Sequence, residues 1–190
     1  MESILVSYYY FDFRDVSKHD LHGLLSSVLI QLCEHSDHCR DILSKLFKTC
    51  GHGLEKPSDT ELSQCLKDIL ELPGRDPVYI IIDALDECPN NMGEPIHRKE
   101  VLDFLERLVE EKHSNLHICL TSRPEQDIKT ALSLLTSDST RVSLHEEDGQ
   151  IEDITNYIQY FVHNDRGMQK MREEDKKHVI DVLSERADGM

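Results

Sequence analysis

The chain has 190 residues, with 21 lysines and arginines against 37 aspartates and glutamates, so its formal net charge is −16. This balance argues against a nucleic-acid-binding surface, which needs clustered positive charge, and against binding to an anionic membrane face. No apolar run approaches the roughly 20 residues of a membrane span, and the start, MESILVSYYY, lacks the features of a secretory signal. Six cysteines without a disulfide-scaffold spacing suggest reduced thiols, so we expect a cytoplasmic protein.

The first part of the chain predicts one strand and three helices. Ile4 to Phe13 is rich in β-branched and aromatic residues, which favours a strand. Asp20 can cap a helix whose apolar residues recur three and four positions apart, namely Leu21, Leu24, Leu25, Val28, Leu29 and Leu32. A second helix is expected over about 37–47. Ser58 and Glu61 then form a capping box that begins a third.

The remainder predicts further strands that alternate with helices. The apolar run Val78–Ile82 predicts a strand buried on both faces. Leu116–Thr121 and Arg141–Leu144 predict two more strands. Helices are expected at Arg98–Glu111, from Pro124 to about Leu135, at Ile151–Phe161 and at Glu173–Arg186. This alternation indicates an α/β fold, with a parallel sheet flanked by helices on both faces.

Three carboxylates follow the Val78–Ile82 strand within five positions: Asp83, Asp86 and Glu87. Acids at the carboxyl end of a parallel strand lie at the ligand-binding edge of an α/β sheet. Asp83 can there reach a Mg²⁺ ion through water, and Asp86 or Glu87 can orient or deprotonate an attacking water. This is the arrangement of a Walker B strand. The alternative is that Asp83 ends a strand and Asp86-Glu87 belongs to a solvated loop.

A second polar motif ends the Leu116–Thr121 strand with Ser122-Arg123-Pro124. Arg123 would be held at the same sheet edge as Asp83, one strand away, where its guanidinium can sense a phosphate and stabilise its charge. The alternative is that Arg123 neutralises the nearby acids or caps a turn. Arg123 follows the acidic strand by about 35 residues, with a predicted helix between them, and this spacing favours the role of phosphate sensor.

Other chemistries have less support in the sequence. Cysteines and histidines cluster between Cys33 and His52, but Cys33 and Cys39 are spaced too widely for a zinc knuckle, and the flanking residues predict helices. Buried free cysteines and surface histidines explain this cluster. The sequence contains no G-x-S-x-G elbow and no cysteine in a diagnostic setting, so no nucleophile is indicated.

Three segments in this order, YYYFDFRD, VYIIIDALDECP and HICLTSRPE, resemble the NACHT ATPase module. NACHT modules belong to the STAND class of P-loop NTPases, which includes the NOD-like receptors, and the chain is most similar to the fungal, nephrocystin-3-like NACHT modules. The resemblance implies Asp83 as the Mg²⁺ acid, Asp86 and Glu87 as catalytic, water-handling acids, and Arg123 as the sensor 1 arginine for ATP. It also implies a partial NACHT core over residues 1–145 and a truncated helical segment, the beginning of the lid region, over 146–190.

The chain departs from the family pattern in its phosphate loop. The pattern G-x-x-x-x-G-K-[ST] does not occur in the sequence, and Gly51-His52-Gly53 lacks both the Lys-Ser/Thr pair and the strand-to-helix context. The first strand and the first helix of the family fold are missing together with that Walker A loop. We therefore expect a gap in the sheet between the Leu116–Thr121 and Arg141–Leu144 strands.

Two hypotheses of different classes follow. The first is a NACHT fragment, cut at both ends, whose parent is an ATP-dependent oligomerisation switch in signalling. Alone, the fragment would bind ATP and Mg²⁺ weakly or not at all. Whether it is an enzyme therefore stays open. The second is a non-catalytic interaction module that self-associates or pairs with a full-length NACHT protein. A metal-dependent hydrolase without a phosphate loop would need further ligands that the sequence does not supply.

Overall fold

The computed structural model describes residues 4–72, 77–90, 97–133, 135, 140–142 and 148–186, with the backbone alone for 148–151. The chain divides into two compact units, residues 1–135 and 136–190, and each is described by itself.

The first unit is built on a three-stranded parallel sheet of β1 (Leu5–Tyr10), β2 (Val78–Asp83) and β3 (Leu116–Leu120), in the spatial order β1-β2-β3. Leu5 is aligned with Val78, and Val78 with Leu116. The strands therefore run in register toward the same edge. The predicted α/β class and the three parallel strands are confirmed.

The helices begin where the sequence provides caps. Asp20 accepts a hydrogen bond from the Gly23 N–H at 2.8 Å at the start of α1 (Leu21–His35), and Ser36 caps α2 (Asp37–Thr49). The predicted capping box of Ser58 and Glu61 is present at the start of α3 (Asp59–Leu70). The helices α4 (His97–Glu110) and α5 (Gln126–Ser133) precede and follow β3.

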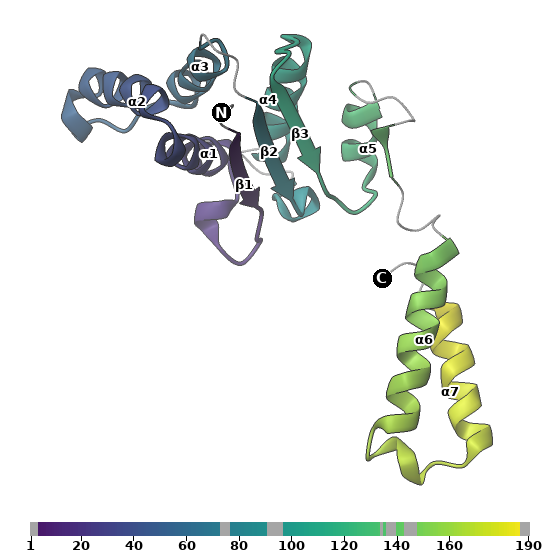
Figure 1. Cartoon of the computed structure of the whole chain (residues 1–190). Coiled ribbons are helices and arrows are strands. Elements are labelled where there is room, and N and C mark those ends of the chain that lie inside the picture. The colour runs from purple at the N-terminus through teal and green to yellow at the C-terminus, as the bar shows by residue number, and fades with distance from the viewer. Residues whose placement is uncertain are drawn as a thin grey trace. The chain divides into compact units, whose positions relative to one another are not determined.

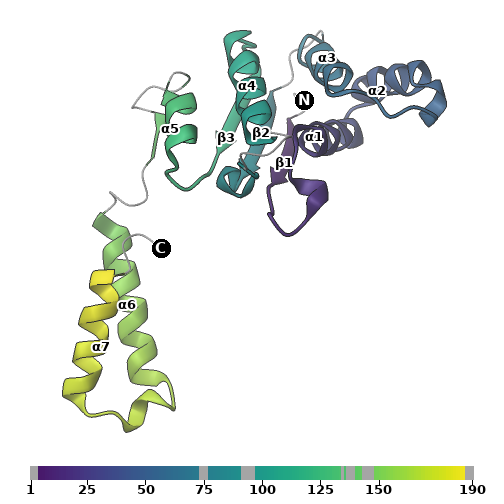
Figure 2. The same cartoon turned by 180° about the vertical axis from the view of Figure 1, so that it is seen from behind.

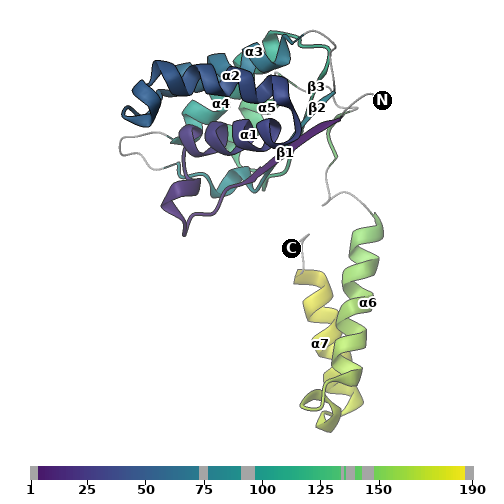
Figure 3. The same ribbon diagram turned by 60° about the vertical axis from the view of Figure 1, so that its left-hand side comes forward.

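The helices of the first unit pack on one face of the sheet, and the expectation that β2 is buried on both faces is wrong. Buried and exposed residues alternate along β1 and β2, so that Ile80 and Ile82 are buried while Tyr79 and Ile81 are exposed. Both crossovers, β1 to β2 and β2 to β3, step in the same direction, and right-handed crossovers of that kind put their helices on the same side. α1 and α4 lie behind the strands in Figure 1 and in front of them in Figure 2. Figure 3 shows the same one-sided layer from a third direction.

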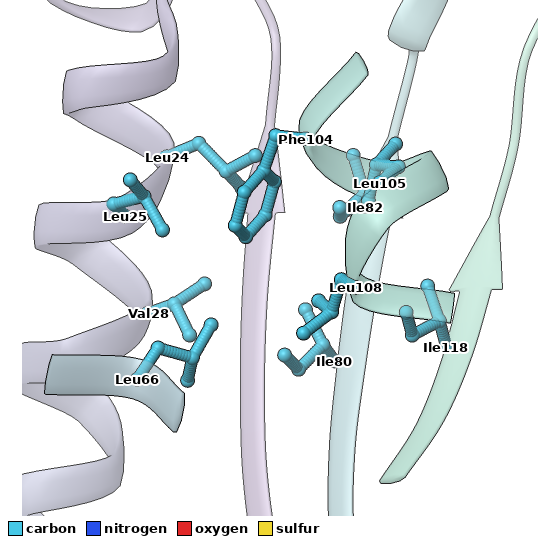
Figure 4. A pocket seen from close by; sticks show the side chains of 10 residues that line it. All are labelled: Leu24, Leu25, Val28, Leu66, Ile80, Ile82, Phe104, Leu105, Leu108 and Ile118. Carbon is cyan, nitrogen blue, oxygen red and sulfur yellow. The ribbon is translucent and has the colours of Figure 1, made fainter. Parts of the chain in front are cut away.

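The core lies between this helical layer and the inward face of the sheet. Figure 4 shows its centre, where side chains from α1, α3 and α4 meet β2 and β3, namely Leu24, Leu25, Val28, Leu66, Ile80, Ile82, Phe104, Leu105, Leu108 and Ile118. The lining is entirely apolar. This space is therefore part of the core and offers no polar group to a ligand.

Three predicted elements differ from the structure. The first strand is Leu5–Tyr10 rather than Ile4–Phe13. α5 begins at Gln126 rather than Pro124, since the segment after β3 forms a tight turn in which the Glu125 N–H donates to the Arg123 carbonyl at 2.8 Å. Of the predicted strand at 141–144, Arg141 and Val142 are not in a strand, and residues 143–144 lie outside the described residues.

The second unit contains the helices α6 (Asp148–Asn164) and α7 (Glu173–Arg186), which pack against each other. Val162 of α6 is buried, and the largely buried Lys176 of α7 pairs with Glu173 at 2.7 Å. Both helices were predicted, the first from the apolar periodicity of Ile151–Phe161 and the second over Glu173–Arg186. Across the described residues, no helix is long and apolar enough to cross a membrane.

The packing in Figure 4 predicts that Leu105→Ala lowers the free energy of unfolding of the first unit by about 3 kcal/mol, because the cavity adds to the lost burial. Urea unfolding followed by circular dichroism measures this change. The control is Val109→Ala on the more exposed side of the same helix, for which we expect a loss below about 1 kcal/mol. Equal losses from the two variants would contradict the packing described.

Candidate functional site

The candidate site lies where β2 and β3 end. Directly after Asp83, Ala84 adopts left-handed backbone angles (φ 55°, ψ 47°), and the short 3₁₀ turn η3 (Leu85–Glu87) follows. The Leu85 side chain is fully buried, and its N–H donates to the Thr121 carbonyl at 3.0 Å. The buried leucine and this hydrogen bond fix the turn, so Asp86 and Glu87 are held at the sheet edge rather than in a free loop.

Asp83 is joined to the neighbouring strand through Thr121. The Thr121 hydroxyl donates to Asp83 Oδ1 and accepts from the Ala84 N–H at 3.1 Å. The strained residue Ala84 is thereby stabilised by a side chain from the end of β3. One carboxylate oxygen of Asp83 is thus engaged, while the carboxylate as a whole is exposed.

Asp86 contacts both the backbone and the side chain of Arg123. Its Oδ1 accepts from the Arg123 N–H at 2.9 Å, and its Oδ2 lies 3.6 Å from the Arg123 Nε. The Asp86 side chain is only 10% exposed, whereas that of Arg123 is 84% exposed. The structure thus places Arg123 one strand from Asp83, as the sequence predicted, in the acid-neutralising contact that was its alternative role. The exposed guanidinium keeps the freedom to turn toward another anion.

Glu87 faces the other neighbour, β1. Its Oε2 accepts from the Phe13 N–H at 3.4 Å, and the Phe11 N–H donates to the Asp83 carbonyl at 3.1 Å. In the loop after β1, the Arg14 guanidinium bonded to Asp12 lowers the pKa of that carboxyl to about 2. The segments that follow all three strands therefore converge on the 83–87 turn, with Asp83, Asp86 and Arg123 toward β3 and Glu87 toward β1.

A buried arginine, Arg98 of α4, holds these loops together, and none of the sequence motifs includes it. Its side chain is 5% exposed. Its guanidinium donates to the carbonyls of Cys88 (2.8 Å) and Asp86 on one side and to Glu125 and Asp127 (3.3 Å) on the other. Arg98 thus ties the turn after β2 to the segment after β3. One signal in the sequence was available. Arg98 lies in the first turn of a helix, where the helix dipole disfavours a cation, so its presence there indicates that other groups stabilise its charge.

The acids fit a magnesium ion only as a partial site. Mg²⁺ is commonly held by one or two carboxylates together with substrate phosphates and water, a role that Asp83 and Thr121 can serve. No group of three histidine, cysteine or acidic side chains that could hold a metal occurs among the described residues. The turn η2 (Gly51–Gly53) has a positive φ at each residue but follows α2 rather than a strand, so it is no phosphate loop.

Five of the six cysteines are buried as core residues are, whereas Cys119 on β3 is exposed. Cys33, Cys65 and Cys88 are buried, and burial is the main cause that raises their pKa values to about 12, 11 and 12. The Cys88 thiol donates to the His19 carbonyl at 3.2 Å. Because the thiolate is the reactive form, such thiols are inert at neutral pH. This agrees with the prediction of structural, buried cysteines.

Comparison with known proteins gives one match. The model of the family described as nephrocystin 3, N-terminal, matches residues 1–123, which include β1, β2, β3 and Arg123. Searches among curated proteins and among solved structures gave no match.

The contacts of Arg98 predict that Arg98→Met destabilises the first unit by about 3 kcal/mol, because buried carbonyls lose their donor. Urea unfolding measures the loss, and hydrogen exchange of the 84–90 and 121–127 amides should rise together. Lys99→Met removes the neighbouring exposed cation, which pairs with Asp103 on the helix surface, and should change stability by no more than about 0.5 kcal/mol. Exchange that rises in one loop alone would contradict the link between them.

Proposed function

The chain belongs to the nephrocystin 3 N-terminal family, and we propose that it supplies the acid-and-arginine half of the nucleotide site of a NACHT-type, ATP-dependent signalling switch. The observation that carries this proposal is the convergence of Asp83, Asp86, Glu87 and Arg123 at one edge of a parallel sheet. The resemblance of YYYFDFRD, VYIIIDALDECP and HICLTSRPE to fungal STAND-class modules supports it.

Each side chain has a role that its surroundings support. Asp83 would hold Mg²⁺ through water, with the Thr121 hydroxyl fixing its carboxylate. Asp86 and Glu87 would orient an attacking water, since both lie in the η3 turn that directly follows Asp83. Arg123, as the sensor 1 residue, would exchange its contact with Asp86 for a phosphate oxygen, and its exposed side chain makes that exchange inexpensive.

The same reasoning limits what these residues do alone. Nucleotide affinity in P-loop proteins comes from backbone N–H groups and a lysine that surround the phosphates. The sequence has no G-x-x-x-x-G-K-[ST] pattern. We infer that these residues bind ATP and Mg²⁺ weakly or not at all by themselves, and that any enzymatic activity requires the missing half of the site.

A second candidate function is a non-catalytic interaction module that self-associates or pairs with a full-length NACHT protein. The two outer strands favour it because their edges differ. At β1, the Gln31 side chain covers the edge by accepting from the Tyr8 N–H at 3.0 Å and donating to the Tyr8 carbonyl at 2.7 Å. At β3, Ile118 and Leu120 direct their backbone groups away from β2, and within the described residues no strand pairs with that side. Such an edge can accept an added strand.

Calorimetric titration with MgATP tests the main proposal. We expect no dissociation constant in the micromolar range, because the acids and Arg123 contact only part of a bound nucleotide. Arg123→Ala should leave this result unchanged. Micromolar binding by the 190-residue chain would contradict the half-site.

Sedimentation and pull-down separate the second candidate from the first. An interaction module should self-associate or retain a full-length NACHT relative, and backbone pairing at β3 should depend on the Ile118 and Leu120 N–H groups. A chain that stays monomeric, unfolds cooperatively and ignores full-length relatives would exclude this candidate and leave the half-site proposal intact.

A further inference from the structure

The segment that forms β1 has a strong tendency to pair with other strands. Residues 4–11, ILVSYYYF, combine β-branched and aromatic side chains with no charge, no proline and no glycine. Segments of this composition associate readily when their edge is exposed, and proteins commonly block such an edge. Among the described strands, β2 alone pairs with β1, so the question is what blocks the other edge.

The backbone groups on that other edge belong to Val6, Tyr8 and Tyr10. The Leu5 N–H donates to the Pro77 carbonyl at 2.9 Å, so the odd-numbered residues of β1 direct their backbone groups toward β2. Because this direction alternates along a strand, the even-numbered residues direct theirs away from β2. We call these three even-numbered residues the open edge, and Tyr8 is its centre.

Gln31 of α1 occupies the centre of the open edge. α1 packs against β1, and Figure 3 shows the two side by side. The Gln31 Oε1 accepts from the Tyr8 N–H at 3.0 Å, and the Gln31 Nε2 donates to the Tyr8 carbonyl at 2.7 Å. These are the two bonds that a residue exchanges with the residue opposite it in an antiparallel hydrogen-bonded pair. One side-chain amide thus takes the place of a neighbouring strand.

A third hydrogen bond holds the amide in this orientation. The Gln31 Nε2 also donates to the hydroxyl of Ser27, four residues earlier on the same side of α1, at 3.0 Å. Both N–H groups and the oxygen of the amide are therefore used. A glutamine side chain loses rotamer freedom when it is fixed, so bonds of this kind are needed to keep it ordered against the strand.

We propose that Gln31 prevents this chain from associating with itself through β1, and that two copies pair antiparallel about Tyr8 once Gln31 is removed. In that pairing the two copies of Tyr8 lie opposite each other, and Val6 lies opposite Tyr10, so the open edge is complementary to itself. A pairing strand has to bond the centre of the edge as well as its ends. Gln31 at Tyr8 leaves only two separated positions.

A second copy is the expected occupant because the open edge is uncharged and self-complementary. The net charge of −16 on each chain opposes association, but salt screens that repulsion, whereas backbone pairing persists. The proposal concerns the edge of the sheet opposite β3 and involves no nucleotide. It therefore goes beyond both candidate functions.

The test compares the full native chain with Gln31→Ala by sedimentation velocity, over a concentration series at physiological and at raised salt. Gln64→Ala is the matched control, since Gln64 is an exposed glutamine of α3 that donates to Asp68 of its own helix at 2.8 Å. Gln31→Met keeps the length and helix propensity of the side chain without its amide, and it repeats the test if Gln31→Ala unfolds early.

We expect Gln31→Ala to associate with itself at least about tenfold more tightly than the native chain and Gln64→Ala do, with the larger difference at raised salt. Adding Tyr8→Lys to Gln31→Ala should restore the native behaviour, because like charges directly opposite each other destabilise a strand pair.

Hydrogen exchange locates the association. In dilute Gln31→Ala the Tyr8 amide should exchange at least about tenfold faster than in the native chain, and its exchange should slow as the concentration rises. Equal association of the native chain and Gln31→Ala, or association that persists in the double variant, would overturn the proposal. Protection that rises at Ile118 and Leu120 instead would also overturn it, because the copies would then pair through β3.

Discussion

The direction in which the three strands follow one another determines most of this structure. Because β1, β2 and β3 are parallel, adjacent in chain order and in register, their carboxyl ends meet at a single edge. Because both crossovers step the same way, their helices pack on a single face. The first consequence gathers Asp83, Asp86 and Arg123, and the second leaves Tyr8 and Ile81 exposed. The candidate site and the exposed side chains of Tyr8 and Ile81 thus share one topological cause.

Within that frame, Arg98 converts a sheet edge into an ordered site. Parallel strands bring their loops near one another, but a loop holds a side chain in place only when its backbone is fixed. One guanidinium bonds carbonyls of the 86–88 segment and carboxylates of the 125–127 segment, so the two loops that carry Asp86 and Arg123 share one buried charge. Removing a buried charge partner costs more than such a pair contributes, which makes this arrangement sensitive to mutation.

The sequence predicted the elements of the first unit well where a local signal exists. Asp20 and Ser58 cap their helices, and the acids after Ile82 and the arginine after Ser122 lie at neighbouring strand ends. The prediction that Tyr79 and Ile81 are buried was wrong. An apolar run indicates that a strand can be covered on both faces, whereas its actual coverage depends on the direction of the crossovers. The sequence also could not predict Arg98, whose partners are distant in the chain, or the hydroxyl of Thr121 that supports Ala84.

The central claim is that the edge formed by β2 and β3 is the part of this chain that meets a nucleotide phosphate. Paramagnetic broadening by Mn²⁺ with millimolar ATP, read on backbone amides, tests it most directly, since it detects contacts far weaker than calorimetry does. The account predicts broadening confined to the amides of Ala84–Glu87 and Thr121–Arg123, and its loss in Asp83→Asn. Broadening centred on Gly51–Gly53, or spread over the acidic surface without regard to Asp83, would contradict it.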